Sequence, residues 1–276
     1  MCASNLCVKA VTFDLWETLL FEKDGHSLRR SDARCMNLAK ALNTIDIKIS
    51  KEQVAQALDK AVSSLVEIWK TDKDVSHMEQ LKLILNCLTE NTLTLKNGWI
   101  SELSRAYTSP IFEVPPYINP DAPHVLEWLK NQNKQTAIIC NTGLTPGIML
   151  KRFLEKNGMA KYFDLMLFSD EVGFRKPHPK IFEIAAEKLN AKPYEIIHVG
   201  DNLKTDVVGA KKAGFKAVHL VCDVGRDRIA EADPKSLVHI SRKLDSLRTT
   251  QTVPDRTISS LATLIEVIKQ LKGQDQ

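Results

Sequence analysis

Five short, almost continuous apolar runs are the feature that most limits the folds open to this chain. They lie at residues 8–15, 136–141, 165–169, 195–200 and 216–222, and helical patterns such as PKIFEIAAEKLN and TDVVGAKKAG separate them. Runs of this kind are typical of strands that are buried on both faces, and strands that alternate with helices form parallel sheets. The sequence therefore predicts an α/β fold with a doubly wound parallel sheet, whose ligand site lies at the carboxyl ends of the strands.

Residues 22–109 have a different pattern, with no strand-like run and several helical stripes. One stripe begins behind Ser50, which can form a capping box with Gln53. We interpret these stripes as the packing positions of a helical bundle rather than as a cofactor site. The prolines of EVPPYINPDAP then lead the chain back to the sheet. The sequence thus predicts an α/β core made of residues 1–21 and 110–276, and an inserted helical domain made of residues 22–109.

Composition and charge argue against several classes of protein. Apolar residues make up 43% of the 276 residues, and the net charge of +4 is spread along the chain among carboxylates, so we expect a folded protein without a nucleic-acid partner. No apolar run reaches membrane-spanning length and no signal-peptide pattern is present, so we expect a cytoplasmic protein that does not contact a membrane. The cysteines are far apart, as expected for free thiols in a reducing compartment. They are Cys2, Cys7, Cys35, Cys87, Cys140 and Cys222.

Polar residues follow the predicted strands, and the carboxyl ends of parallel strands meet at one edge of a sheet. Three carboxylates, one lysine and several hydroxyl, thiol and amide groups are therefore expected to come together. This set suits phosphoryl transfer, which needs a carboxylate nucleophile, carboxylates that hold Mg²⁺, and a cation with N–H groups for the phosphate oxygens. In chain order the residues are Asp14, Thr18, Cys140, Asn141, Thr142, Lys176, Asp201 and Asp206.

Four motifs, FDLWETL, CNTG, RKPHP and GDNLKTD, resemble in order and spacing those of the haloacid dehalogenase-like hydrolases. The resemblance covers nearly the whole chain up to residue 222, and it implies a Rossmann-like core with a helical cap domain. It further implies that Asp14 is the nucleophile, which forms an aspartyl phosphate in the phosphatases of the family, and that Lys176 neutralises charge beside it. By the same resemblance, Mg²⁺ would be held by Asp14, by the backbone carbonyl of Trp16 and by Asp201, with Asp206 in support.

The resemblance also implies that a phosphate oxygen is bound at the end of the second strand. The family usually has Ser or Thr there, whereas this chain has Cys140, and a thiol is a poorer hydrogen-bond donor. Asn141, the following backbone amides, Thr142 and Thr18 are therefore further candidates for phosphate binding. Nearby Lys176 could favour a reactive thiolate at Cys140, but we favour a buried, inert thiol.

Trp16 is the largest departure from the family's phosphatases, which have an aspartate two residues after the nucleophile. That aspartate acts as general acid and base, a role worth roughly 10²–10⁴ in rate. An aromatic residue here resembles the 2-haloacid dehalogenases, but these use no metal and typically replace the GDxxxxD motif, whereas Asp201 and Asp206 are both present. The neighbouring Glu17 is the nearest candidate to replace the missing acid, but it lies one position further on, where the chain should turn, so we favour an ordinary loop carboxylate.

The sequence therefore favours a Mg²⁺-dependent phosphatase that acts on a small phosphorylated metabolite. Two alternatives stay open: a hydrolase of the 2-haloacid dehalogenase type, and a weakly catalytic protein of the same fold that binds a phosphate ligand. The cap, rather than the motifs, is expected to select the substrate.

Two segments near the end of the chain, SLVHISRKLDSL and RTISSLATLIEVIKQL, both resemble the strand and helix that close such a domain. The second has the better helical stripe, so we expect residues 223–253 to form an extended loop or excursion. This excursion follows the carboxyl end of a strand and could bring Arg226 or Arg228 to the substrate, although we favour solvated arginines.

Overall fold

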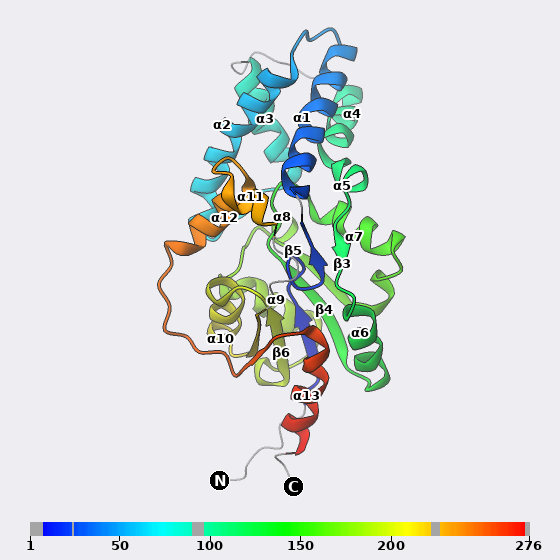
Figure 1. Cartoon of the computed structure of the whole chain (residues 1–276), viewed down its shortest axis with the longest axis vertical. Coiled ribbons are helices and arrows are strands. Elements are labelled where there is room, and N and C mark those ends of the chain that lie inside the picture. Colours follow the sequence, from blue (N-terminus) through cyan, green and yellow to red (C-terminus); the bar gives the residue numbers. More distant parts are fainter. Residues whose placement is uncertain (1–7, 24, 90–96, 222–226, 274–276) are drawn as a thin grey trace.

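The computed structural model describes residues 8–23, 25–89, 97–221 and 227–273. Its centre is a sheet of six parallel strands in the order β5-β4-β1-β6-β7-β8 (Figure 1). The doubly wound α/β fold predicted from the sequence is confirmed. The strands are β1 (Ala10–Phe13), β4 (Gln135–Cys140), β5 (Leu165–Phe168), β6 (Ile196–Gly200), β7 (Lys216–Leu220) and β8 (Arg256–Ile258).

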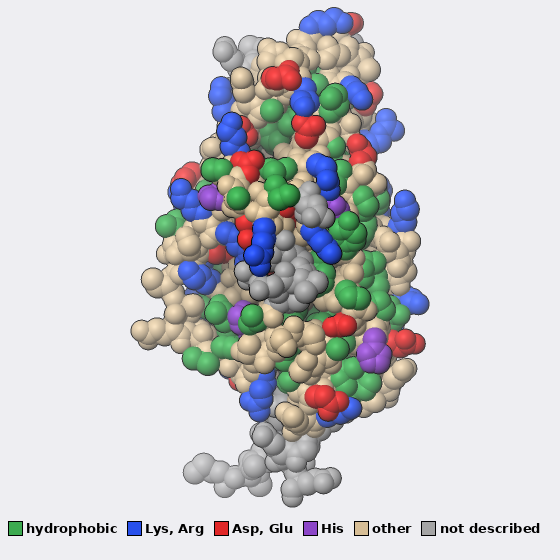
Figure 2. All heavy atoms as spheres, viewed as in Figure 1, with side chains coloured by type: hydrophobic (Ala, Val, Ile, Leu, Met, Phe, Trp, Pro, Cys, Tyr) green, Lys and Arg blue, Asp and Glu red, His purple; other side chains and the backbone are tan. Residues whose placement is uncertain are grey.

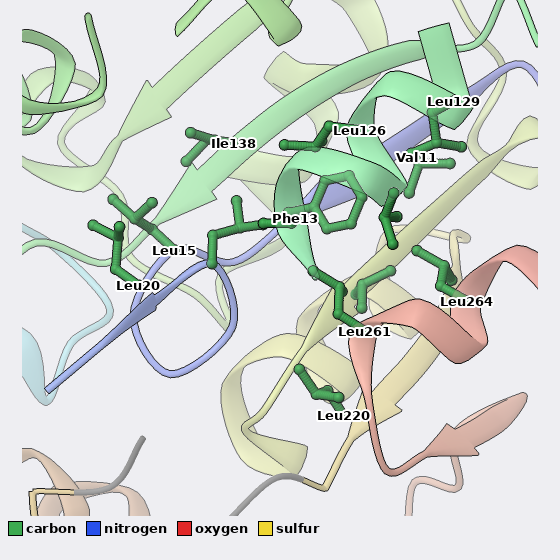
Figure 3. Close-up of a cluster of buried hydrophobic side chains, with 14 of the residues drawn as sticks. Val11, Phe13, Leu15, Leu20, Leu126, Leu129, Ile138, Leu220, Leu261 and Leu264 are labelled. Atoms are coloured by element: carbon green, nitrogen blue, oxygen red, sulfur yellow. The ribbon is translucent and has the colours of Figure 1, made fainter. Parts of the chain in front are cut away.

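Helices cover both faces of this sheet because alternate strand side chains point to opposite sides. Val11 and Phe13 of β1 pack in one apolar cluster with α6 (Ala122–Asn131), α7 (Gly147–Lys156) and α13 (Leu264–Gly273). Figure 3 shows Phe13 in this cluster together with Ile138 of β4 and Leu126 of α6. On the other face Ala10 packs with α9 (Pro179–Lys188) and α10 (Val208–Lys212). Burial on both faces explains why the strands are apolar throughout.

Four helices between β2 and β3 form a second apolar cluster, at the upper end of the elongated molecule in Figure 1. The predicted capping box is present, since the backbone N–H of Gln53 donates to Ser50 Oγ over 3.2 Å and the backbone N–H of Ser50 donates to Gln53 Oε1 over 2.9 Å. The domain boundaries at residues 21/22 and 109/110 stay a prediction. The helices are α1 (His26–Thr44), α2 (Lys51–Trp69), α3 (His77–Thr89) and α4 (Asn97–Thr108), flanked by α5 (Pro110–Glu113) and the antiparallel pair β2 (Leu20–Phe21) and β3 (Tyr117–Ile118).

The excursion before β8 is helical rather than an extended loop. It contains α11 (Arg228–Ala232) and α12 (Leu237–Ser246), so SLVHISRKLDSL is a helix, while RTISSLATLIEVIKQL supplies the closing strand β8 and helix α13. Leu237, Ile240 and Leu244 recur at helical spacing and pack against the α1–α4 cluster, which explains why this segment is a helix. Arg226 lies outside the described residues.

Figure 2 shows acidic and basic side chains interspersed over one face of the molecule. In the described part of the chain, no helix combines the length and the apolar character needed to cross a bilayer.

Candidate active site

The carboxyl ends of β1, β4 and β6 meet at one cavity because β1 lies between the other two strands. The cavity has a volume of about 210 Å³. Most of the polar residues expected at this edge line it, but Thr18 and Cys140 do not. Those that line it are Asp14, Asn141, Thr142, Lys176, Asp201 and Asp206.

Lys176 joins two of the carboxylates. Its Nζ lies 2.5 Å from Asp14 Oδ1 and 2.6 Å from Asp206 Oδ1, and only 2% of its side chain is exposed. Lys176 precedes α9, in the loop that follows α8 (Ser169–Val172). A single buried ammonium therefore lies between the predicted nucleophile and a predicted metal-site carboxylate.

Burial and the crowding of charge shift the pKa values of these groups in different directions. Burial raises the pKa of Asp14 to about 7, although Lys176 acts against it. The pKa of Lys176 is raised, because the attraction of Asp14 and Asp206 outweighs the effect of burial. The pKa of Asp206 is lowered, since Lys176 and His198 outweigh burial, and Asp206 therefore stays ionised.

Asp206 is fixed by the backbone that follows β6. The Asn202 N–H donates to Asp206 Oδ2 over 3.0 Å, and His198 Nε2 lies 3.3 Å from Oδ1. A Cβ atom at Gly200 would lie 2.3 Å from the Asp206 carboxyl group, which is closer than nonbonded atoms approach. The glycine of the GDNLKTD motif thus leaves room for the last aspartate of the same motif.

Asp14, Asp201 and Asp206 form a cluster that could hold a metal ion. Each offers a carboxylate oxygen, and these oxygens lie within 4.8 Å of one another. Burial and the negative charges of Glu17, Asp206 and Asp14 raise the pKa of Asp201 well above its usual range. Oxygen ligands of this kind suit Mg²⁺. The residues therefore fit the metal that the sequence implies, whereas a part for the Trp16 carbonyl stays a prediction.

Asn141 holds the backbone of Lys176. Its Oδ1 accepts the Lys176 N–H over 2.7 Å, and its Nδ2 donates to the Lys176 carbonyl over 2.9 Å. Because both ends of the side-chain amide bind the Lys176 backbone, Asn141 positions the lysine, and its own backbone and the second Nδ2–H group remain for the predicted phosphate contact. Thr142 is also occupied, since its hydroxyl lies 3.1 Å from Ser169 Oγ and 3.4 Å from Asp74 Oδ2.

Cys140 and Thr18 lie beneath the cavity surface. Cys140 is completely buried in the apolar cluster of the sheet, and burial raises the pKa of its thiol well above the usual range, with Asp14 acting in the same direction. The hydroxyl of Thr18 is also buried and has no hydrogen-bond partner among the residues that the structure describes. Neither side chain lines the cavity, so their contact with phosphate stays a prediction, and a protonated, buried Cys140 fits the inert thiol that we favoured.

Exchange of Cys140 for serine tests this assignment. We expect Cys140→Ser to stay active and to lose activity in dilute peroxide at the same rate as the wild type, because a buried neutral thiol reacts slowly. The measurement is residual activity against time of exposure, with the half-exposed Cys87→Ser variant in parallel. Marked peroxide resistance in Cys140→Ser alone would show that Cys140 is reactive.

The turn after Asp14 brings Glu17 to the cavity. Glu17 has a left-handed backbone with φ of 59°, and its N–H donates to the Leu20 carbonyl over 2.7 Å. Both Trp16 and Glu17 line the cavity, and Glu17 forms an ion pair with Arg242. The expectation that Glu17 is an ordinary loop carboxylate was therefore wrong, because its side chain lies at the cavity and forms an ion pair.

Arg242 is the main residue of the site that the sequence did not reveal. It lies on α12, and its Nη2 is 3.4 Å from Asp201 Oδ2, while its Nε is 3.5 Å from Glu231 Oε1. From the sequence, the excursion could bring Arg226 or Arg228 to the substrate. In the structure Arg228 does not line the cavity, whereas Arg242 does. The available signal was the helical spacing of Val238, Arg242 and Asp245, which places these cavity-lining residues on one face of α12.

Comparison with known proteins assigns the fold and the family. A family model of haloacid dehalogenase-like hydrolases matches residues 8–214, about three quarters of the chain. The chain belongs to this hydrolase family. The match includes all four motifs of this hydrolase and ends before α11 and α12, so the excursion lies outside the matched region.

Relatives of this hydrolase include phosphatases. The glyceraldehyde 3-phosphate phosphatase of Methanopyrus kandleri is 26% identical over 96% of this chain and 98% of its own length. A crystal structure of a HAD phosphatase from Thermococcus onnurineus has 25% identity and a TM-score of 0.57 over 94% of this chain and 97% of its own. A 2-haloacid dehalogenase from Pseudomonas syringae has a TM-score of 0.63 over 95% and 99% of the two chains, and at 19% identity that likeness shows the fold alone.

Proposed function

We propose that this hydrolase is a Mg²⁺-dependent phosphatase that cleaves a small phosphorylated metabolite through an aspartyl phosphate on Asp14. The observation that carries this proposal is the cluster of Asp14, Asp201 and Asp206, two of which, Asp14 and Asp206, form ion pairs with Lys176. The similarity to a glyceraldehyde 3-phosphate phosphatase over almost the full chain supports the substrate class. In this proposal residues 22–109 are the cap that covers the cavity.

The residues present account for a two-step reaction. In the first step a carboxylate oxygen of Asp14 attacks phosphorus, and the bond from phosphorus to the leaving oxygen breaks. Lys176, 2.5 Å from Asp14, neutralises charge on the transferred group. In the second step water attacks phosphorus, inorganic phosphate leaves and the Asp14 carboxylate is restored. Bound Mg²⁺ would stabilise the negative charge of the phosphoryl oxygens.

Loss of Asp201 should weaken Mg²⁺ binding. We expect Asp201→Ala to raise the Kd for Mg²⁺ by at least about 100-fold, since removal of a supporting residue alone typically costs 10–100-fold. Calorimetric titration with Mg²⁺ measures the Kd, and Glu67→Ala, which removes an exposed carboxylate from α2, is the matched control. Equal Mg²⁺ affinity in Asp201→Ala and wild type would place the metal elsewhere.

A substrate screen tests the proposed function as a whole. Phosphorylated metabolites and 2-haloacids are each incubated with the protein in Mg²⁺ and in EDTA, and released phosphate or halide is measured. Phosphate release that requires Mg²⁺ is the expected result. Halide release that EDTA does not affect would instead identify a dehalogenase, and silence with both classes would favour a phosphate-binding protein.

A cytoplasmic location and a small-molecule partner belong to the same proposal. The free thiols of Cys35, Cys87 and Cys140 support a reducing compartment. The other three cysteines, Cys2, Cys7 and Cys222, lie outside the described residues.

A further inference from the structure

A second, smaller cavity of about 70 Å³ adjoins the catalytic cavity. It lies between α1, α2 and the start of α12, and Arg34 lines it. The two cavities are neighbours because they share wall residues. The shared residues are Ser27, Arg30, Leu144, Thr145 and Leu237.

Arg34 is a buried cation whose recorded partners are uncharged. It is 2% exposed, and its Nε donates to the Tyr107 carbonyl over 3.0 Å. Its Nη2 donates to the Leu144 carbonyl over 3.2 Å and lies 3.5 Å from the Thr145 hydroxyl. Among the described residues, Arg34 forms no ion pair with a carboxylate. A charge buried in this way is costly unless an opposite charge compensates it.

Arg30 places a second buried guanidinium one helical turn before Arg34, on the same face of α1. It is 5% exposed, it donates to the Val114 carbonyl, and it forms an ion pair with Glu22. Burial lowers the pKa of Arg34 and Arg30 acts in the same direction, which indicates that the two cations repel each other. Lys235 also lines the second cavity, and the carboxylate that lines it is the exposed Asp59. With Glu22 paired to Arg30, three cations face two carboxylates, so the cavity wall keeps an excess positive charge.

Arg30 also connects this cavity with the catalytic residues. Its guanidinium lies over the Trp16 ring, 5.5 Å from the ring centre, and Trp16 is two residues after Asp14. Both Arg30 and Trp16 line the catalytic cavity. A short molecule could therefore extend from Asp14 past the indole to the arginines.

We propose that Arg30 and Arg34 bind a second anionic group of the substrate, a carboxylate or a second phosphate, while the phosphate to be cleaved lies at Asp14 and Lys176. This inference rests on the phosphatase function proposed above. Guanidinium groups form strong, charge-assisted hydrogen bonds with both kinds of anion. The substrate class narrows accordingly to small phosphorylated acids or bisphosphates.

Binding of three stable phosphonates to the full chain in Mg²⁺ tests the proposal. Propylphosphonate carries one anionic group, 3-phosphonopropionate adds a carboxylate, and propane-1,3-bisphosphonate adds a second phosphonate. We expect at least one of the two doubly anionic compounds to bind about 10–100-fold more tightly than propylphosphonate in a calorimetric titration. The preferred compound identifies the second group as carboxylate or phosphate.

Three variants test whether this preference depends on Arg34. Arg34→Gln should reduce it to less than about threefold, whereas Arg29→Gln, which removes an exposed arginine from the same helix, should retain it. Arg34→Lys keeps the positive charge and should retain part of the preference. It is the variant to measure if Arg34→Gln does not fold.

Two outcomes would overturn the inference, and they are distinguishable. Equal binding of all three compounds by the wild type, or an unchanged preference in folded Arg34→Gln, would reject the anion site and leave the phosphatase function standing. Absence of binding by every phosphonate, in protein that still binds Mg²⁺, would reject the phosphate site at Asp14 and Lys176, and the inference with it.

Discussion

Replacement of Asp14 by asparagine is expected to lower kcat for phosphate release by at least about 10⁴-fold, because an amide cannot serve as the attacking nucleophile. The two side chains are nearly isosteric. Lys176 would keep Asp206, 2.6 Å from its Nζ, as a partner, so the buried ammonium is not left without an opposite charge. The variant should therefore fold. Single-turnover phosphate release measures the loss, and circular dichroism with a thermal melt checks the fold.

A control variant with the same Asp-to-Asn substitution tests whether the loss of one negative charge alone lowers kcat. Asp46→Asn makes the same substitution at an exposed position whose left-handed backbone, with φ of 64°, asparagine tolerates well, and it should leave kcat unchanged. Retention of more than about a tenth of the wild-type rate in folded Asp14→Asn would contradict the covalent mechanism.

The strands and the residues at their ends could be predicted because local pattern determines both. Strands buried on two faces must be apolar, and parallel pairing brings their carboxyl ends together. The predictions for Asp14, Lys176 and Asp201 depended on this rule and on the order of the motifs, and the structure brings all three to one cavity. Even there, the apolar run at residues 8–15 exceeds the strand, since β1 spans Ala10–Phe13 and the residues beyond it turn towards β2.

The contacts that sequence reasoning missed join residues far apart in the chain. Arg242 meets Glu17 across 225 positions, and nothing in either neighbourhood indicates the pairing. The two hydrogen bonds between the Asn141 side chain and the Lys176 backbone could not be predicted either. An asparagine after a strand indicates a polar contact but not its partner. The sequence pattern thus indicates which side chains reach the site. The packing of loops and helices determines which partner each side chain binds there.

The excursion is the clearest case of this limit. Its amphipathic pattern predicts a helix but does not say where in the fold that helix packs. In the structure Asp227, just before α11, accepts hydrogen bonds from the backbone N–H groups of Gly25 and Ser27 over 2.9 and 3.2 Å. At the other end of α12, Asp245 accepts from Asn202 over 2.6 Å. The segment is therefore tied both to the start of α1 and to the loop that carries Asp201, and neither tie has a sequence signature.

Aspartate at position 16 should raise the turnover of alkyl phosphates selectively, by up to the roughly 10²–10⁴ that a positioned general acid contributes. The indole of Trp16 lines the cavity but cannot protonate a leaving oxygen. An alkoxide needs that proton, whereas an aryl oxide leaves readily as an anion. Trp16→Asp is thus expected to increase the ratio of alkyl to aryl phosphate turnover, measured as kcat/KM for one ester of each kind.

The competing explanation for Trp16 is packing, and the structure shows what packing would be lost. The Arg30 guanidinium lies over the indole, 5.5 Å from the ring centre, and the indole packs against the apolar cluster of the sheet. Trp16→Phe keeps an aromatic ring without adding an acid, so it should leave the ratio of alkyl to aryl turnover unchanged while sharing some of the packing loss. Because Arg30 retains its ion pair with Glu22, loss of the indole alone should not unfold α1. If Trp16→Asp folds, as judged by circular dichroism, and its alkyl-to-aryl ratio equals or falls below that of Trp16→Phe, then a missing acid is not what distinguishes this site, and Trp16 serves to shape the pocket beside Arg30.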